Sequence, residues 1–255
     1  MAIKIAVSNQ KGGSGKTTTT QNLAGALAEH NKTILVVDAD PQASLTVGWG
    51  IDVSALEQTM YNVVVEHEPL QNILISVRDN IDLAPANIYL SVAELKLAGE
   101  YRREDRIKSA LADLEKPYDY VLIDCPPSLG LLTINAFSAA DSVLIPMSCD
   151  YYAMVGVKLL LDSIIRTKNQ INPKLDILGV VATRYDRRTA HSKEILEELK
   201  NKLEPDVRLF KAVIRETVRF KEAPIEGKTI TEYNDAHAGA EDYRDLAREV
   251  IGIYG

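Results

Sequence analysis

The chain has 255 residues, of which 46% are hydrophobic and 25% charged, and its formal net charge is −7. This length allows one large domain with a buried core, and the composition excludes a disordered chain. Two cysteines exclude a disulfide framework or a cysteine-rich zinc site and favour a reduced, cytoplasmic setting. The acidity argues against nucleic-acid binding, but residues 184–228 carry 12 Lys+Arg and 9 Asp+Glu, a local charge of +3 in a chain whose remainder is −10.

Short β-branched runs alternate with longer helical patterns along the chain. Strands are expected, in chain order, at Ile3–Ser8, Thr33–Asp38, Ile81–Ala84, Tyr120–Asp124, Ser142–Pro146, Ile177–Thr183 and Arg208–Ile214. Helices are expected at residues 16–29, Arg103–Glu115, Val155–Asn169, Ser192–Lys202 and Ala240–Ile251. Near-continuous apolar strands between amphipathic helices predict one α/β domain over residues 1–255, in which a mainly parallel sheet has helices on both faces.

Several other classes of protein do not fit the sequence. It contains no run of eighteen apolar residues, and Met1–Val7 has no signal-peptide pattern, so we expect neither a membrane span nor export. Nothing precedes the first strand, so we expect no N-terminal helix-turn-helix and no operator-specific DNA binding. The four histidines are scattered, without the spacing of metal ligands.

A glycine-rich segment, residues 11–17 (KGGSGKT), follows the first expected strand. Strand, loop, Gly-Lys-Thr and helix occur in the order of a P-loop, which makes a chance glycine-rich turn a poor alternative. The glycines let backbone N–H groups face phosphate oxygens, and the helix beginning near Lys16 adds its positive dipole end. We expect Lys16 on the β- and γ-phosphates of a nucleotide and the Thr17 hydroxyl on Mg²⁺. The plain P-loop pattern has glycine at position 10, where this chain has Gln10.

Carboxylates follow two further strands. Asp38 and Asp40 lie two residues apart at the end of the second strand, so they point the same way and can serve one metal–phosphate site. Asp124 ends a buried apolar strand, which is the Walker B arrangement that holds Mg²⁺ directly or through water. Each aspartate alone is equally typical of a helix N-cap or a turn, and the P-loop in the same chain favours the metal site.

Together these segments resemble the deviant Walker A ATPases, and within them the ParA/Soj-type partition ATPases. The matching stretches are Gln10–Thr19, Val37–Gln42, Asp124–Asn135, Thr217–Pro224 and Gly239–Ala247, which span the chain almost end to end. The resemblance implies a single-domain P-loop NTPase that binds ATP and Mg²⁺, with a phosphate cradle formed by Lys11, Gly12, Gly13, Ser14, Gly15, Lys16, Thr17 and Thr18.

The resemblance also implies roles for individual residues. Lys11 matches the signature lysine that reaches across a dimer interface to the partner's nucleotide, where a second cation stabilises developing charge. Asp40 matches the carboxylate that positions or activates the attacking water, so Lys11, Lys16 and Asp40 are the expected catalytic residues. Asp38, Asp124 and Thr17 are the expected magnesium residues.

In the family that the chain resembles, basic residues near the C-terminus bind DNA without sequence preference. Arg188 and Arg219 match such arginines, and Lys193, Arg215 and Lys221 are further candidates. Phosphate contacts require only flexible cations on one face and no base readout. Each of these side chains is equally well explained as a solvated surface charge among glutamates.

The expected function is an ATP-dependent homodimer that binds nonspecific nucleoid DNA and hydrolyses ATP slowly. A ParB-like activator protein would stimulate hydrolysis, and the output would be segregation of plasmid or chromosome DNA. Three alternatives remain: a ParA-like positioning ATPase for a protein cargo, a MinD-like membrane-switched ATPase, and a metabolic P-loop ligase or kinase. The metabolic alternative does not explain Lys11, and the C-terminal helix has no Lys or Arg after Arg248, which disfavours a stable membrane anchor.

The chain departs from the family pattern at a few positions. Asp150 replaces a longer acidic residue before a Tyr-Tyr pair, and Arg215-Glu216 stands where relatives often have Pro-Arg. Cys125 and Cys149 are expected to be buried thiols rather than cluster ligands, and Trp49 is expected to pack.

Overall fold

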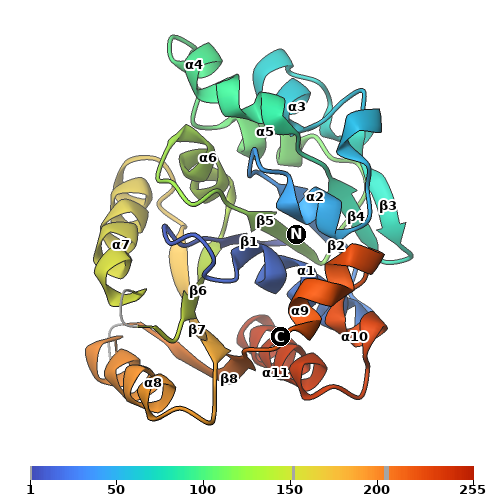
Figure 1. The fold of residues 1–255 in the computed structure, drawn as a ribbon. Helices are drawn as coiled ribbons and strands as arrows, with labels where there is room; N and C mark the ends of the chain where they lie inside the picture. The colour runs from blue at the N-terminus through green and yellow to red at the C-terminus, as the bar shows by residue number, and fades with distance from the viewer. Residues whose placement is uncertain (1, 151–152, 204–206) are drawn as a thin grey trace.

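The computed structural model describes residues 2–150, 153–203 and 207–255 (Figure 1). Within them, eight strands form one sheet in the order β3-β4-β2-β5-β1-β6-β7-β8. Their bounds are β1 Ile3–Val7, β2 Ile34–Asp38, β3 Ile75–Arg78, β4 Ile81–Ala84, β5 Tyr120–Asp124, β6 Ser142–Ser148, β7 Asp176–Tyr185 and β8 Leu209–Arg215. Neighbouring strands are parallel except β3 and β4, which are antiparallel.

The α-helices lie between these strands and after the last one. Their bounds are α1 Lys16–Glu29, α2 Ser44–Gly48, α3 Met60–Glu66, α4 Ala93–Leu97, α5 Arg106–Ala112, α6 Leu131–Ala139, α7 Ala153–Gln170, α8 Ala190–Leu203, α9 Arg219–Glu222, α10 Ile230–Tyr233 and α11 Ala238–Tyr254. Among the described residues, no helix is both long and apolar enough to cross a membrane.

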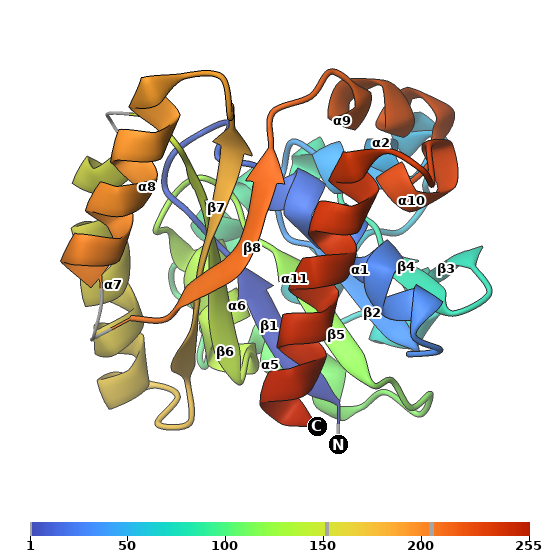
Figure 2. The ribbon, with the colours of Figure 1, turned by 90° about the horizontal axis from the view of Figure 1, so that it is seen from below.

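The two faces of the sheet are buried under different helices (Figure 2). Alternate residues of a strand point to opposite faces. Val36 belongs to the core cluster that contains side chains of α1 and α11, whereas Leu35 and Val37 belong to the other cluster, which contains side chains of α3 to α8. On the face covered by α1 and α11, the core includes Leu23 of α1 and the fully buried Tyr243 of α11. This two-sided burial explains why the central strands read as continuous apolar runs.

The expected fold class is confirmed: a mainly parallel sheet with helices on both faces. All seven expected strands are present, but the antiparallel edge strand β3 was not predicted, because its four residues are a short hairpin partner of β4. Helices α2, α3, α4, α6, α9 and α10 were also not predicted, and α5 is shorter than the expected Arg103–Glu115. Helix α6 is buried along most of its length, and its less buried residues, Leu131 and Ile134, are apolar, so it has no amphipathic period to detect.

The outer strand β8 has an irregular register against β7, and a side chain of α11 binds the backbone there. The register of β8 against β7 shifts between the pairs Val180–Leu209 and Ala182–Val213. Within the shifted segment, the backbone N–H groups of Lys211 and Ala212 donate to the carboxylate of Glu249, at 3.1 and 2.7 Å. A side chain of α11 therefore satisfies two backbone donors of this edge strand.

Candidate nucleotide and magnesium site

The glycine-rich loop joins the carboxyl end of β1 to the first turn of α1. Gly13 and Gly15 have φ values of 75° and 89°, a left-handed conformation that glycine adopts without steric cost. The hydroxyl of Thr183, near the end of β7, donates to the carbonyl of Ser14 at 2.8 Å. The loop is thus curved by its glycines and held by a hydrogen bond from β7, which lies two strands from β1 in the sheet.

Polar groups in this loop are arranged to receive an anion. Lys16 is only 7% exposed, and burial lowers the pKa of its ammonium group. The Ser14 hydroxyl and the Gln10 side-chain amide nitrogen are buried without a hydrogen-bond partner among the described residues. Buried polar groups are normally satisfied, so these groups fit a ligand with several acceptor oxygens. The phosphates of ATP meet that requirement at the N-terminus of α1.

The magnesium residues predicted from the sequence converge beside the loop. Val7 and Asp124 are register partners across β1 and β5, and Asp38 pairs with Asp124 across β2 and β5. The Thr17 hydroxyl donates to Asp124 Oδ2 at 2.7 Å. Burial, reinforced by the nearby charge of Asp38, raises the pKa of Asp124 to about 8. A divalent cation supplies the positive charge that such buried carboxylates need, so Thr17 and Asp124 fit Mg²⁺.

Asp38 contacts the loop that follows β2. Its Oδ2 accepts from both the hydroxyl and the backbone N–H of Thr46, at 2.7 and 2.9 Å, and its Oδ1 accepts from the N–H of Asp40 at 3.2 Å. Burial raises the pKa of Asp38 to about 6. The Thr46 hydroxyl in turn accepts from the N–H of Ala86, beyond β4. In this arrangement Asp38 fixes the segment that presents Asp40, which is 8% exposed, to the site.

Lys11 lies at the start of the loop, and its ammonium group forms an ion pair with Asp150, beyond β6. Its backbone N–H donates to Asn9 Oδ1 at 3.0 Å, and the Asn9 amide donates to the carbonyl of Pro146 at 2.7 Å. The side chain of Lys11 is 32% exposed. The signature lysine is therefore held at the surface by its own chain, beside the phosphate loop.

A cavity of about 260 Å³ opens next to the phosphate loop. It lies between the ends of β7 and β8 and the helices α9 and α11, and its lining includes Gly13, Gly15, Thr18, Arg184, Glu216 and Phe220. Phe220 packs edge-on against Tyr243, with ring centroids 5.5 Å apart. The mixture of aromatic and polar groups, adjoining a phosphate cradle, fits the base and ribose of a nucleotide.

The predicted DNA-contacting residues all lie near the carboxyl ends of β7 and β8, the edge that also carries the phosphate loop (Figure 2). Arg188 pairs with Asp186 at 2.8 Å, and this hydrogen-bonded arginine lowers the pKa of Asp186 to about 2. Arg219 pairs with Glu222 at 2.6 Å.

The other three basic candidates differ in exposure. Lys193 and Lys221 are exposed. Arg215 forms a bidentate pair with Asp242, at 2.6 and 2.7 Å, and is 23% exposed. Its guanidinium thus joins β8 to α11.

Other residues singled out from the sequence have packing roles. Cys125 and Cys149 are buried free thiols, as expected, and burial raises the pKa of each. Trp49 is 3% exposed, with the guanidinium of Arg78 5.5 Å from its ring centroid. Among the described residues, no group of three or more His, Cys, Asp or Glu side chains is placed to hold a metal.

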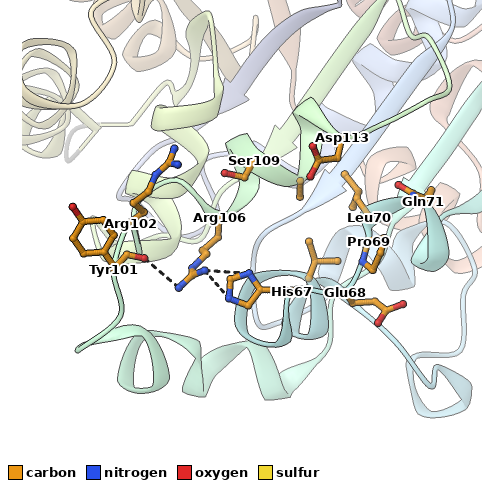
Figure 3. A pocket seen from close by; sticks show the side chains of 12 residues that line it. His67, Glu68, Pro69, Leu70, Gln71, Tyr101, Arg102, Arg106, Ser109 and Asp113 are labelled. Atoms are coloured by element: carbon orange, nitrogen blue, oxygen red, sulfur yellow. Dashed lines mark hydrogen bonds between the residues drawn. The ribbon is translucent and has the colours of Figure 1, made fainter.

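A separate cavity of about 390 Å³ lies between α3 and α5, where Arg106 donates to the ring of His67 (Figure 3). None of the predicted site residues lines it.

Sequence reasoning missed several residues that build the nucleotide site. Thr183 and Thr46 brace the phosphate loop and Asp38 through hydroxyl groups, and Arg184 lies over Gly13. Thr183 ends an expected strand at the functional edge of the sheet, and that position alone could have identified it. Thr46 lies eight residues after Asp38 within a short helix, where no local pattern marks its contact.

The fold and the site together define a P-loop ATPase. A family model described as an AAA domain matches residues 2–177. The protein Soj of Bacillus subtilis is 45% identical over 247 residues, which cover 96% of this chain and 97% of Soj. The chromosome partitioning protein ParA of Caulobacter vibrioides is 41% identical over 250 residues, covering 97% and 93%.

Structural similarity extends over the same length. The crystal structure of cobyrinic acid a,c-diamide synthase from Mycobacterium smegmatis, with a bound ATP analogue and magnesium, is similar with a TM-score of 0.87 and 34% identity, covering 98% of this chain and 95% of that one. The chain belongs to the AAA-domain family and, within it, to the ParA/Soj family of deviant Walker A ATPases. It is an ATPase whose cofactors are ATP and Mg²⁺.

Proposed function

We propose that this chain is an ATP-dependent dimerising switch that binds DNA without sequence preference and segregates plasmid or chromosome DNA. The observation that carries the proposal is the position of the basic candidates on the same sheet edge as the phosphate loop. Cations at that edge can respond to the nucleotide state of the site beside them, and they need no base readout to bind phosphates. The similarity to Soj and ParA over nearly the whole chain supports this output.

In the proposed cycle, two copies close over two ATP molecules. Lys11 would exchange Asp150 for the phosphates of the partner's nucleotide, so ATP itself becomes part of the interface. Asp40 would orient the attacking water, and Lys16 and Thr17 would hold the phosphates and Mg²⁺. Hydrolysis would be slow until a ParB-like activator protein stimulates it, and the chain would be cytoplasmic and associated with the nucleoid.

Within this proposal the basic residues have unequal roles. Lys193 and Lys221 are exposed. Arg188 and Arg219 pair with Asp186 and Glu222, whose side chains are 28% and 38% exposed, and a phosphate can replace such partly exposed acids at low cost. Arg215 would have to leave Asp242, whose side chain is 8% exposed and would become an unpaired buried charge. We therefore assign Arg215 to shaping the DNA face and the other four to contacting DNA.

Binding to random-sequence duplex DNA tests the proposal directly. The experiment compares no nucleotide, ADP–Mg²⁺ and ATP–Mg²⁺, each at two salt concentrations. We expect binding only with ATP–Mg²⁺, and weaker binding at the higher salt concentration because phosphate contacts release counterions. Absence of binding in every state would refute the DNA-binding switch while leaving the ATP site standing.

A metabolic enzyme is the second candidate, because the similar Mycobacterium smegmatis structure carries the name of a diamide synthase. Such an enzyme would turn over ATP only with a small-molecule acceptor. ATP hydrolysis to ADP and phosphate, stimulated by DNA and a partner protein in the absence of any other acceptor, would exclude this candidate.

A further inference from the structure

An ion pair crosses the rim of the cavity beside the phosphate loop. The Nε of Arg184, at the end of β7, donates to Glu216 Oε2 at 3.0 Å, just beyond β8. The Nη1 of the same guanidinium lies 3.4 Å from the carbonyl oxygen of Gly13. One side chain therefore links three separate segments of the cavity wall: the phosphate loop, β7 and the loop after β8.

The backbone conformation of Arg184 is further evidence that this contact has a function. Its φ is 54°, a left-handed conformation that is unfavourable for a residue with a side chain. Such conformations persist where the surrounding structure over-determines them, and they cluster at ligand clamps. The neighbouring N–H of Glu216 donates to the carbonyl of Tyr185 at 3.0 Å, which continues the β7–β8 pairing up to the rim.

The wall formed by residues 215 and 216 is fixed from two sides. Arg215 points toward α11 and binds Asp242, whereas Glu216 points toward β7 and binds Arg184. The Arg215–Asp242 pair is mostly buried, but Arg184 and Glu216 are 52% and 39% exposed. The more exposed Arg184–Glu216 pair is thus the weaker of the two. It is also the pair that joins this wall of the cavity to Gly13.

We propose that Arg184 and Glu216 act as a pair of positioning residues that hold the wall of the cavity against the base and ribose of the bound nucleotide. The pair contributes to binding of the nucleoside part and not of the phosphates, which the loop itself holds. The inference rests on the assignment of the nucleotide site described above. The Arg184–Glu216 pair would contribute to binding of the nucleoside independently of the phosphate loop.

Comparing two ligands distinguishes a contribution to nucleoside binding from an effect on the phosphate loop. ADP–Mg²⁺ occupies both parts of the site, whereas tripolyphosphate–Mg²⁺ occupies the phosphate cradle alone. Calorimetric titration of Arg184→Met and Glu216→Gln should show ADP–Mg²⁺ bound about two- to five-fold more weakly, as expected for a half-exposed pair. Tripolyphosphate–Mg²⁺ should bind with unchanged affinity. The KM for ATP should rise by the same factor, with kcat unchanged at saturating ATP.

Three further variants make the test decisive. The double variant Arg184→Met/Glu216→Gln should lose no more than the worse single variant, because both changes remove the same contact. Arg184→Gly removes the pair and also the backbone strain, so it should weaken ADP binding without lowering the melting temperature. Glu197→Gln, which breaks an exposed pair with Lys200 on α8, is the matched control and should change neither ligand's affinity.

Specific results would overturn the proposal. Unchanged ADP affinity in both single variants would show that Arg184 and Glu216 do not contribute to nucleoside binding. Equal losses of affinity for ADP and tripolyphosphate would show that the pair acts on the phosphate loop instead. Additive losses in the double variant would show that the two residues do not act as a pair. Binding of ADP–Mg²⁺ by the unaltered chain tests the nucleotide site by itself, so failure of that site is seen separately.

Discussion

Replacing Asp242 with alanine isolates what holds β8 to α11. The Asp242 carboxylate accepts from Arg215 Nε and Nη2 at 2.6 and 2.7 Å, and from the backbone N–H of Arg215 at 3.1 Å. The hydrogen bond to Asp242 raises the pKa of the guanidinium. The guanidinium still stays charged when Asp242 is removed, because arginine is not deprotonated at neutral pH. The change would leave a mostly buried cation and one backbone donor without an acceptor.

The size of the loss follows from burial. Removing one partner of a fully buried ion pair costs about 3–5 kcal/mol. Arg215 is 23% exposed, so water can reach part of its guanidinium, and we expect the free energy of unfolding to fall by about 2–3 kcal/mol. The unfolding entropy of a 255-residue chain is about 0.5 kcal/mol/K, so the melting temperature should fall by about 5 °C.

Urea and thermal unfolding of Asp242→Ala measure this loss against Glu197→Ala as the exposed control. The control should change the free energy of unfolding by less than about 0.5 kcal/mol. Because the Asp242 pair is mostly buried, most of the loss should persist at high salt. A loss in Asp242→Ala no larger than the control would refute the structural role of Arg215. So would an Arg215→Gln variant that keeps full stability but loses DNA binding.

The remaining predictions concern the proposed cycle. Lys16→Ala should abolish ATP binding or Mg²⁺-dependent turnover, because it removes the buried cation of the phosphate cradle; unchanged ATPase activity would contradict the site. Asp40→Ala should trap the ATP dimer by slowing hydrolysis, which size-exclusion chromatography with ATP would show, and rapid dissociation of that variant would count against its role. Arg219→Glu should weaken DNA binding at least tenfold, by reversing a phosphate contact, and leave dimerisation intact. Lys200→Glu on α8 is the charge-matched control, and full DNA binding by Arg219→Glu would place the DNA face elsewhere.

The sequence predicts the centre of the fold better than its margins. Strands such as Tyr120–Asp124 are continuous apolar runs that end in a predicted site residue, so both their type and their boundary can be read directly. Strand β3 and helix α6 lack such a signal. Strand β3 is an outer strand of only four residues, and α6 is buried on nearly all sides. The conformation of β3 depends on its pairing with β4, and that of α6 depends on packing against elements such as β1 that are distant in the sequence.

The same division applies to the site. Residues in the phosphate loop and at strand ends are found from local order, because the chemistry requires fixed spacing there. The contacts of Arg184 with Gly13 and of Arg215 with Asp242 join residues 171 and 27 positions apart, so no local pattern reveals them. Charge alone made Arg215 a DNA candidate, and only its partner distinguishes a structural cation from an available one.

The carboxylate of Glu249 has a consequence for how copies of this chain can associate. An outer strand with unpaired N–H groups is a template onto which another chain can add a strand, which leads to open-ended polymers. At Lys211 and Ala212 these donors are already occupied, and the strand is irregular at that point. Growth by strand addition at this margin is therefore disfavoured. Association of copies along β8 would then have to use side-chain surfaces rather than a shared sheet.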